Sequence, residues 1–154
     1  SSFTPNRAHP QAVDDFLSSV YTATEPRNVF SIAVTGGGSA VIADLFTVPG
    51  ASNSLMHASI PYSHAALSEL LGNPQHPQSC SKETAILMAK AVFKHTVSQL
   101  LTDNDGRFDV LSEVNIFGVA GTAALVSSRP KKGLHRCHVS TFSSQNCVRT
   151  WDVY

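Results

Sequence analysis

Charged residues are scarce in this chain of 154 residues, and neither sign is in excess. Lys and Arg number 11, as do Asp and Glu, so the formal net charge is zero. Proteins that bind nucleic acid by neutralising its phosphates need a positive excess, so no nucleic-acid partner is expected. No apolar run approaches the roughly 20 residues that cross a bilayer. The first residues also lack the pattern of a signal peptide. We therefore expect no membrane partner and a cytoplasmic location.

Metal-binding and disulfide patterns are also lacking. The three cysteines, Cys80, Cys137 and Cys147, are an odd number with no Cys-x-x-Cys pair, which is typical of free thiols in a reducing compartment. The segment from His135 to His138 holds two histidines and a cysteine. On a strand, however, His135 and Cys137 share one face while His138 points to the other. No further pair completes a tetrahedral set, so no metal is expected.

Apolar residues follow helical spacing in some segments and short continuous runs in others. Because strands alternate with helices, the sequence predicts an α/β fold with a mainly parallel or mixed sheet. We expect a loose lead-in over residues 1–11 and a single domain over 12–154. The predicted helices cover residues 13–20, 39–46, 63–71 and a long stretch from 81, and the predicted strands cover 29–34, 55–62, 109–117 and 134–142.

Three consecutive glycines, Gly36, Gly37 and Gly38, lie between a predicted strand and a predicted helix. Free backbone N–H groups and the helix dipole make such a position an anion site. A second pair, Gly118 and Gly121, also follows a predicted strand, so two glycine loops can face one ligand. The alternative is that the glycines only form tight turns, and the residues favour neither interpretation. The pattern matches neither a P-loop nor a dinucleotide fingerprint.

The order of the motifs resembles the C-terminal domain family of the competence/damage-inducible protein CinA, over about residues 13–149. That family includes nicotinamide mononucleotide amidases. The resemblance implies a three-layer α/β/α fold and amide hydrolysis without a metal or cofactor. The motifs that carry it are, in order, Thr35-Gly-Gly37, Val48-Pro-Gly-Ala-Ser52, Tyr62-Ser-His-Ala-Ala-Leu-Ser-Glu-Leu-Leu-Gly72, Ser81-Lys-Glu-Thr-Ala-Ile-Leu-Met-Ala89, Gly118-Val-Ala-Gly121 and Arg129-Pro-Lys-Lys-Gly133.

The residues that the family uses for chemistry are altered here. In the family a serine attacks the carboxamide, and a tyrosine and a lysine manage its proton, since a serine hydroxyl needs such activation. The family's Ser-Cys-Thr-Gly-Gly motif reads Ala33-Val-Thr-Gly-Gly37, which puts alanine at the nucleophile. Its Tyr-Ser-Asn-Glu-Ala-Lys motif reads Tyr62-Ser-His-Ala-Ala-Leu67, which keeps Tyr62 and replaces the lysine with Leu67.

Two further family segments differ as well. Phe117 precedes Gly118 where Thr or Ser is usual, and Thr122 replaces a proline. The segment Phe142-Ser-Ser-Gln-Asn146 lacks the family's arginine. We therefore predict a divergent member with weak or absent amidase activity and a residual site for a nicotinamide mononucleotide-like ligand. The residues expected to line that site are Thr35, Gly36, Gly37, Gly38, Gly118, Gly121 and Thr122.

Two alternatives remain open at this point. In the first, the chain is an active amidase in which Ser39 is a displaced nucleophile and His64 its base, beside Tyr62. The simpler interpretations are that Ser39 caps a helix and that His64 is an exposed helical residue. In the second, the chain is a non-catalytic assembly subunit. Trp151 and Tyr154 lie where the family continues into a helix, and an apolar face left there suits a homo-oligomer.

Overall fold

A five-stranded mixed sheet forms the centre of the fold in this computed structural model, which describes residues 10–125 and 133–154. The strands lie in the order β2-β1-β3-β4-β5. The first three run parallel to one another, and β4 and β5 are added antiparallel. Their bounds are β1 Arg27–Gly36, β2 Leu55–Ser59, β3 Val114–Ala124, β4 Arg136–Ser143 and β5 Val148–Val153.

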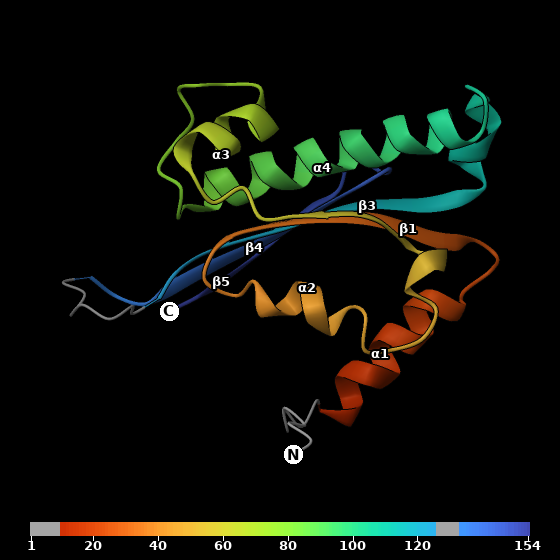
Figure 1. The fold of residues 1–154 in the computed structure, drawn as a ribbon, viewed down its shortest axis with the longest axis horizontal. Helices are drawn as coiled ribbons and strands as arrows, with labels where there is room; N and C mark the ends of the chain where they lie inside the picture. The colour runs from red at the N-terminus through yellow and green to blue at the C-terminus, as the bar shows by residue number, and fades with distance from the viewer. Residues whose placement is uncertain (1–9, 126–132) are drawn as a thin grey trace, which may run out of the picture.

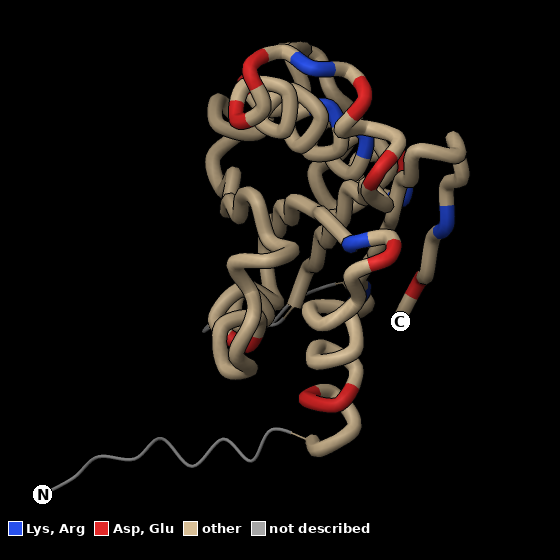
Figure 2. Tube along the Cα trace, turned by 90° about the vertical axis from the view of Figure 1, so that its right-hand side faces the viewer, with Lys and Arg blue, Asp and Glu red and all other residues tan. Residues whose placement is uncertain are grey.

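Helices cover both faces of the sheet, so the predicted three-layer α/β/α arrangement is confirmed (Figure 1). α1 (Gln11–Thr22) and the short α2 (Ala40–Asp44) lie on one face, and α3 (His64–Leu71) and α4 (Lys82–Asp103) lie on the other. Two 3₁₀ turns, Ala51–Asn53 and Phe108–Ser112, precede β2 and β3. Figure 2 shows basic and acidic residues interspersed, with no concentration of one sign in that view.

The helices on the α4 side begin where the sequence predicts. Ser81 caps α4, since its hydroxyl accepts from the Thr84 N–H at 3.2 Å, and Ser63 caps α3 in the same way through the Ala66 N–H at 3.1 Å. Gly72 ends α3 with φ 63°, the left-handed conformation that glycine adopts without steric cost. These caps fix where the chain between β2 and α4 becomes helical and where α3 ends.

Each face of the sheet has its own core. On the α1 side, Tyr21 is buried and its hydroxyl donates to the Leu45 carbonyl at 2.7 Å, which ties α1 to the end of α2. On the α4 side, the buried Thr96 donates to the Ser31 hydroxyl at 2.6 Å, which ties α4 to β1. Buried polar groups of this kind keep a hydrogen bond, because desolvating them unpaired costs free energy.

The predicted second glycine loop is wrong. The strand predicted over 109–117 begins at Val114 and continues through Gly118 and Gly121 to Ala124. Gly118 faces α4, where a Cβ would collide with the Ala89 carbonyl oxygen. A glycine inside a strand therefore lets the helix backbone approach, rather than making a turn.

The ends of several predicted elements also differ. The strand predicted over 55–62 ends at Ser59, because Pro61 and the α3 cap follow, and the helix predicted over 39–46 is limited to α2. The strand predicted over 134–142 corresponds to β4, which is followed by a further strand that was not predicted. The segment with Trp151, where the family continues into a helix, forms β5 and pairs along β4, with Val139 opposite Trp151. α1 begins at Gln11, inside the predicted lead-in; residues 1–9 and the basic residues of the 127–133 loop lie outside the described residues.

Candidate functional site

The glycine turn at the carboxyl end of β1 has a structural explanation. Gly36 has φ 78°, and a Cβ there would collide with the Ala123 carbonyl oxygen of β3. The Gly37 N–H donates to that same oxygen at 3.2 Å, and a Cβ on Gly37 would overlap the Leu125 side chain. Only Gly38, with φ 90°, has open space where a side chain would begin. Gly38 also has a positive φ, which L side chains rarely adopt, so the alternative that the glycines allow a tight turn applies to all three.

Ser39 follows this turn and precedes α2. It is exposed, has helical backbone angles and makes no side-chain capping bond. Ser39 thus lies at the N-cap position of α2, but the predicted capping hydrogen bond from its side chain is absent. α2 has five residues, so few peptide dipoles add at its N-terminus, and the predicted helix contribution to an anion site is small.

The positions that the resemblance assigns to the nucleophile and the lysine meet in the fold. Ala33, on β1, is 0% exposed and Leu67, on α3, is 1% exposed. Both belong to one apolar cluster with Met88 and Val92 of α4 and Ala120 of β3. Alanine and leucine here pack as core and present no polar group to solvent. Positions 33 and 67 therefore lie in the same apolar cluster, and the side chains around them are apolar.

Thr35 and Thr122 lie opposite each other on β1 and β3. The Thr35 hydroxyl donates to the Pro61 carbonyl at 2.9 Å, and the Thr122 hydroxyl donates to the Ser79 carbonyl at 2.6 Å. Both side chains are buried. Their hydroxyls thus hold the loops on either side of α3 against the sheet, and their predicted contact with a ligand stays a prediction.

Tyr62 and His64 lie at the start of α3 and are both exposed, Tyr62 at 75%. The His64 ring packs against the His76 ring in a tilted arrangement, with centroids 4.5 Å apart, and His76 Nδ1 lies 2.8 Å from the Pro77 carbonyl oxygen. This histidine pair fastens the loop after α3 to its N-terminus. Within residues 10–125 and 133–154, no hydrogen bond joins Ser39 to either Tyr62 or His64.

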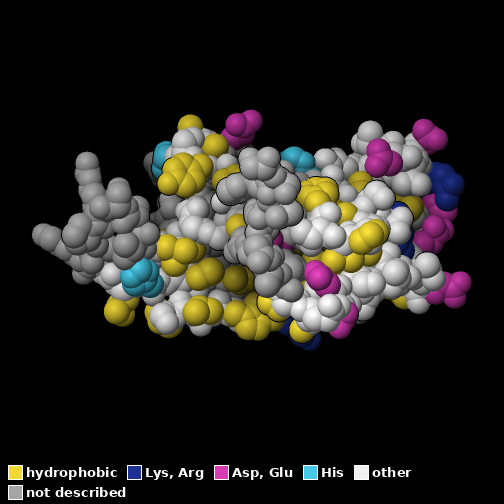
Figure 3. Space-filling view, turned by 60° about the horizontal axis from the view of Figure 1, so that its bottom comes forward, with side chains coloured by type: hydrophobic (Ala, Val, Ile, Leu, Met, Phe, Trp, Pro, Cys, Tyr) yellow, Lys and Arg dark blue, Asp and Glu magenta, His cyan; other side chains and the backbone are white. Residues whose placement is uncertain are grey.

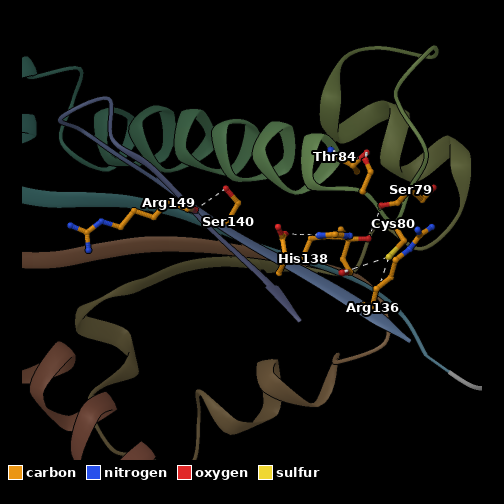
Figure 4. Close-up of polar contacts among 10 residues, drawn as sticks. Ser79, Cys80, Thr84, Arg136, His138, Ser140 and Arg149 are labelled. Carbon is orange, nitrogen blue, oxygen red and sulfur yellow. Dashed lines mark hydrogen bonds and ion pairs between the residues drawn. The ribbon is translucent and has the colours of Figure 1, made fainter. Parts of the chain in front are cut away.

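One polar pair was missed by the sequence reasoning. His138 of β4 is buried, and its Nδ1 lies 2.7 Å from the Asp152 carboxylate of β5 (Figure 4). An Nδ1–H donated to a carboxylate leaves Nε2 with a lone pair. The strand alternation that puts His138 on the opposite face from His135 was a signal that His138 could be singled out. Its partner Asp152, however, lies on β5, a strand that was not predicted.

A cysteine lies beside this pair. Cys80 Sγ is 3.8 Å from the Arg136 carbonyl oxygen and 4.0 Å from that of Thr122, in the same cluster (Figure 4). On the opposite face, burial raises the pKa of the Cys137 thiol, with Cys80 adding to the shift. In the described part of the chain the cysteines are free, as predicted, and no three side chains are arranged to hold a metal ion.

An apolar groove of about 230 Å³ opens between α2 and the sheet. Val34, Val41, Gly121, Cys137 and Val139 are among its walls, and a Cβ on Gly121 would extend into open space. Figure 3 shows apolar side chains gathered along this face of the molecule. Gly121, predicted to bind a ligand from a loop, thus lies on the floor of a groove. No helix in the described ranges has the length and apolar character needed to span a membrane.

Comparisons with known proteins agree with the fold. No protein-family model and no curated protein matches the sequence. Among solved structures, the competence/damage inducible protein CihA from Agrobacterium tumefaciens is 16% identical with a TM-score of 0.67, over 91% of this chain and 79% of its own. A CinA superfamily protein from Enterobacter cloacae is 12% identical with a TM-score of 0.65, over 99% and 82%.

A competence or damage-inducible protein from Enterobacter asburiae is similar to the same degree, at 13% identity and a TM-score of 0.62, over 92% and 80%. At such low identity the likeness concerns the fold. The chain therefore has a CinA-like α/β fold, and the resemblance drawn from its motifs is confirmed at that level. A nucleotide ligand, self-association and a cytoplasmic location stay predictions.

Proposed function

With a CinA-like fold as the premise, we propose that this chain binds a nicotinamide mononucleotide-like nucleotide and hydrolyses its carboxamide weakly or not at all. The observation that carries the proposal is the packing of Ala33 and Leu67. Both are buried in one apolar cluster, at the positions where the resemblance puts a serine and a lysine. Alanine has no lone pair to attack a carbonyl carbon, and leucine transfers no proton.

The binding part of the proposal rests on the carboxyl end of β1. In open α/β sheets ligands lie beyond the carboxyl ends of the parallel strands, and the turn at Gly38 lies there with open space around it. Tyr62 is exposed, so its ring and hydroxyl are free to contact a ligand. The turn is packed on β3, because Gly36 lies close to the Ala123 carbonyl oxygen and the Gly37 N–H donates to it.

One observation favours a second candidate, an amidase that uses Ser39. The Ser39 hydroxyl is exposed and makes no capping bond, so it is not committed to the helix. An attacking serine needs a base within hydrogen-bond reach, and His64 stacks on His76 instead. We therefore rank this candidate second, and a Ser39→Ala variant separates it from the first.

The test is a titration of ¹⁵N-labelled protein with nicotinamide mononucleotide, followed by amide NMR. Saturable shifts are expected at Gly36, Gly37 and Gly38, while the ligand's carboxamide signal persists. Gly38→Ala should weaken binding, because its Cβ enters the open space at the turn. Gly72→Ala is the matched control, since Gly72 also has positive φ and open space but lies at the end of α3. Absence of saturable shifts, or equal effects of both variants, refutes the site.

A further inference from the structure

A second site lies on the α4 side at the outer edge of the sheet. A cavity of about 570 Å³ opens there between β2, α3 and α4. This is within the range of about 300–1,000 Å³ that is usual for small-molecule sites. Neither Gly38 nor Tyr62 lines it, so it is distinct from the glycine turn at the carboxyl end of β1. Its lining residues are His57, Ser59, Ile60, Pro61, Ala66, Glu69, Leu70 and His95.

The imidazole rings of two histidines are in contact in this cavity. His57 of β2 and His95 of α4 have ring centroids 5.9 Å apart and planes at 85°, an edge-to-face arrangement. Ser59 is two residues beyond His57 on the same strand, so both side chains point to the same face. Each neutral imidazole has one ring nitrogen that accepts a hydrogen bond. The imidazoles and the Ser59 hydroxyl therefore come from β2 and α4 and line one cavity.

Two buried side-chain oxygens have no partner, one on Ser59 of the lining and one on Gln99, which lies outside the lining on α4. Ser59 Oγ and Gln99 Oε1 form no hydrogen bond, and they are two of the three such side-chain atoms found in the described residues. Gln99 follows His95 by one helical turn, so it lies on the same face of α4. Gln99 Oε1 can only accept a hydrogen bond, and Ser59 Oγ can also accept one. Unpaired buried polar atoms cost stability, and a group that donates hydrogen bonds relieves that cost.

The charge of the lining indicates the sign of the ligand. Glu69 supplies a carboxylate, and no Lys or Arg is part of the lining. The lining therefore supplies a carboxylate and further hydrogen-bond acceptors, with no basic side chain of Lys or Arg to balance them. The remaining wall is apolar, from Ile60, Pro61 and Leu70. A metal ion is the poorer fit, because no group of three ligating side chains was found among the described residues.

We propose that this cavity binds a small organic cation, a primary ammonium that carries an apolar group. The Glu69 carboxylate accepts from the ammonium. Its other two N–H groups are accepted by the Ser59 hydroxyl and by one of the two imidazoles, His57 or His95, since an ammonium has three donors. The apolar group packs on Ile60 and Leu70. The proposal is independent of nucleotide binding at the β1 turn.

The test uses three ligands of similar shape and different charge: benzylammonium, benzyl alcohol and benzoate. Each is titrated into the whole chain, with the imidazole signals of His57 and His95 followed by NMR. Saturable shifts with benzylammonium are expected, with affinity lower by about tenfold or more for benzyl alcohol, which lacks the charge-assisted hydrogen bond. Benzoate should not bind. Equal or tighter binding of benzoate, or no saturable shift with any of the three, overturns the proposal.

A matched pair of variants tests the role of the carboxylate. Glu69→Gln should reduce benzylammonium affinity by about tenfold or more. Glu113→Gln removes an exposed carboxylate outside the cavity and should leave that affinity unchanged. Both residues are exposed, so the two variants should melt near the native temperature. Glu69→Gln should also leave the nicotinamide mononucleotide shifts at Gly38 unaltered. If both variants bind benzylammonium as the native chain does, Glu69 is not the anchor and the proposed cation site is refuted.

Discussion

Replacing Leu67 tests whether the position of the family's lysine is truly part of the core. Leu67 is 1% exposed and belongs to one buried apolar cluster with Ala33, Met88 and Val92. Truncating such a leucine costs about 2–5 kcal/mol, because apolar contacts are lost and a cavity remains. We expect about 3 kcal/mol for Leu67→Ala and less than about 1.5 kcal/mol for Leu67→Met, which conserves the volume.

Leu67→Lys is the sharper variant, because it puts an ammonium where the surroundings are carbon. The free energy of unfolding at pH 7 should fall at least as far as for Leu67→Ala, since an unpaired charge is desolvated. Desolvation lowers the folded-state pKa of a lysine below its usual value of about 10.4. Between the lowered pKa of the folded state and the usual pKa of the unfolded state, the unfolded chain binds more protons than the folded one. The free energy of unfolding should therefore rise with pH over that interval.

The assay is urea unfolding of the native chain and the three variants, at pH 7 and again near pH 10. The order of stability expected at pH 7 is native, Leu67→Met, Leu67→Ala and Leu67→Lys. A Leu67→Lys variant as stable as the native chain at pH 7 would refute the reasoning. It would mean that the lysine head reaches solvent and that the site is open rather than packed.

Three further outcomes follow from the contacts of the fold. Gly118→Ala should lower the free energy of unfolding by about 1–3 kcal/mol, because its Cβ meets the backbone of α4, whereas Gly121→Ala should be near neutral in the same urea assay. Tyr21→Phe should cost about 1 kcal/mol through the lost hydrogen bond. Burial raises the pKa of Tyr21 above 10.0, so native stability should fall as pH rises past 10.0, a loss that Tyr21→Phe should lack. Iodoacetamide should modify the exposed Cys147 before Cys137, whose raised pKa leaves less thiolate, as peptide mass spectrometry can measure.

Local signals were sufficient for the helices on the α4 side. The serines before α3 and α4 and Gly72 act through bonds or backbone angles within a few residues, so the sequence predicts them well. The glycines of β3 could not be interpreted in that way. Gly118 is required by α4, which packs on it from about 30 residues earlier in the chain, and no local pattern reports such a contact.

The candidate site was predictable in part. The motif order identified Ala33 and Leu67 as corresponding positions, and the fold brings them into one cluster. Their burial depends on how α3 and α4 close over the sheet, which the motifs do not encode. His138 and Asp152 meet because β4 and β5 pair in one register, and β5 has mostly exposed residues, so no apolar alternation marked it as a strand.

The most direct test of the central claim is ammonia release from nicotinamide mononucleotide at high protein concentration. Ala33 and Leu67 offer neither a nucleophile nor a proton carrier, so the native chain should release little or no ammonia above the rate without protein. Ser39→Ala should behave in the same way. Release by the native chain that disappears in Ser39→Ala would contradict the account, because it would mean that the nucleophile has moved to the start of α2.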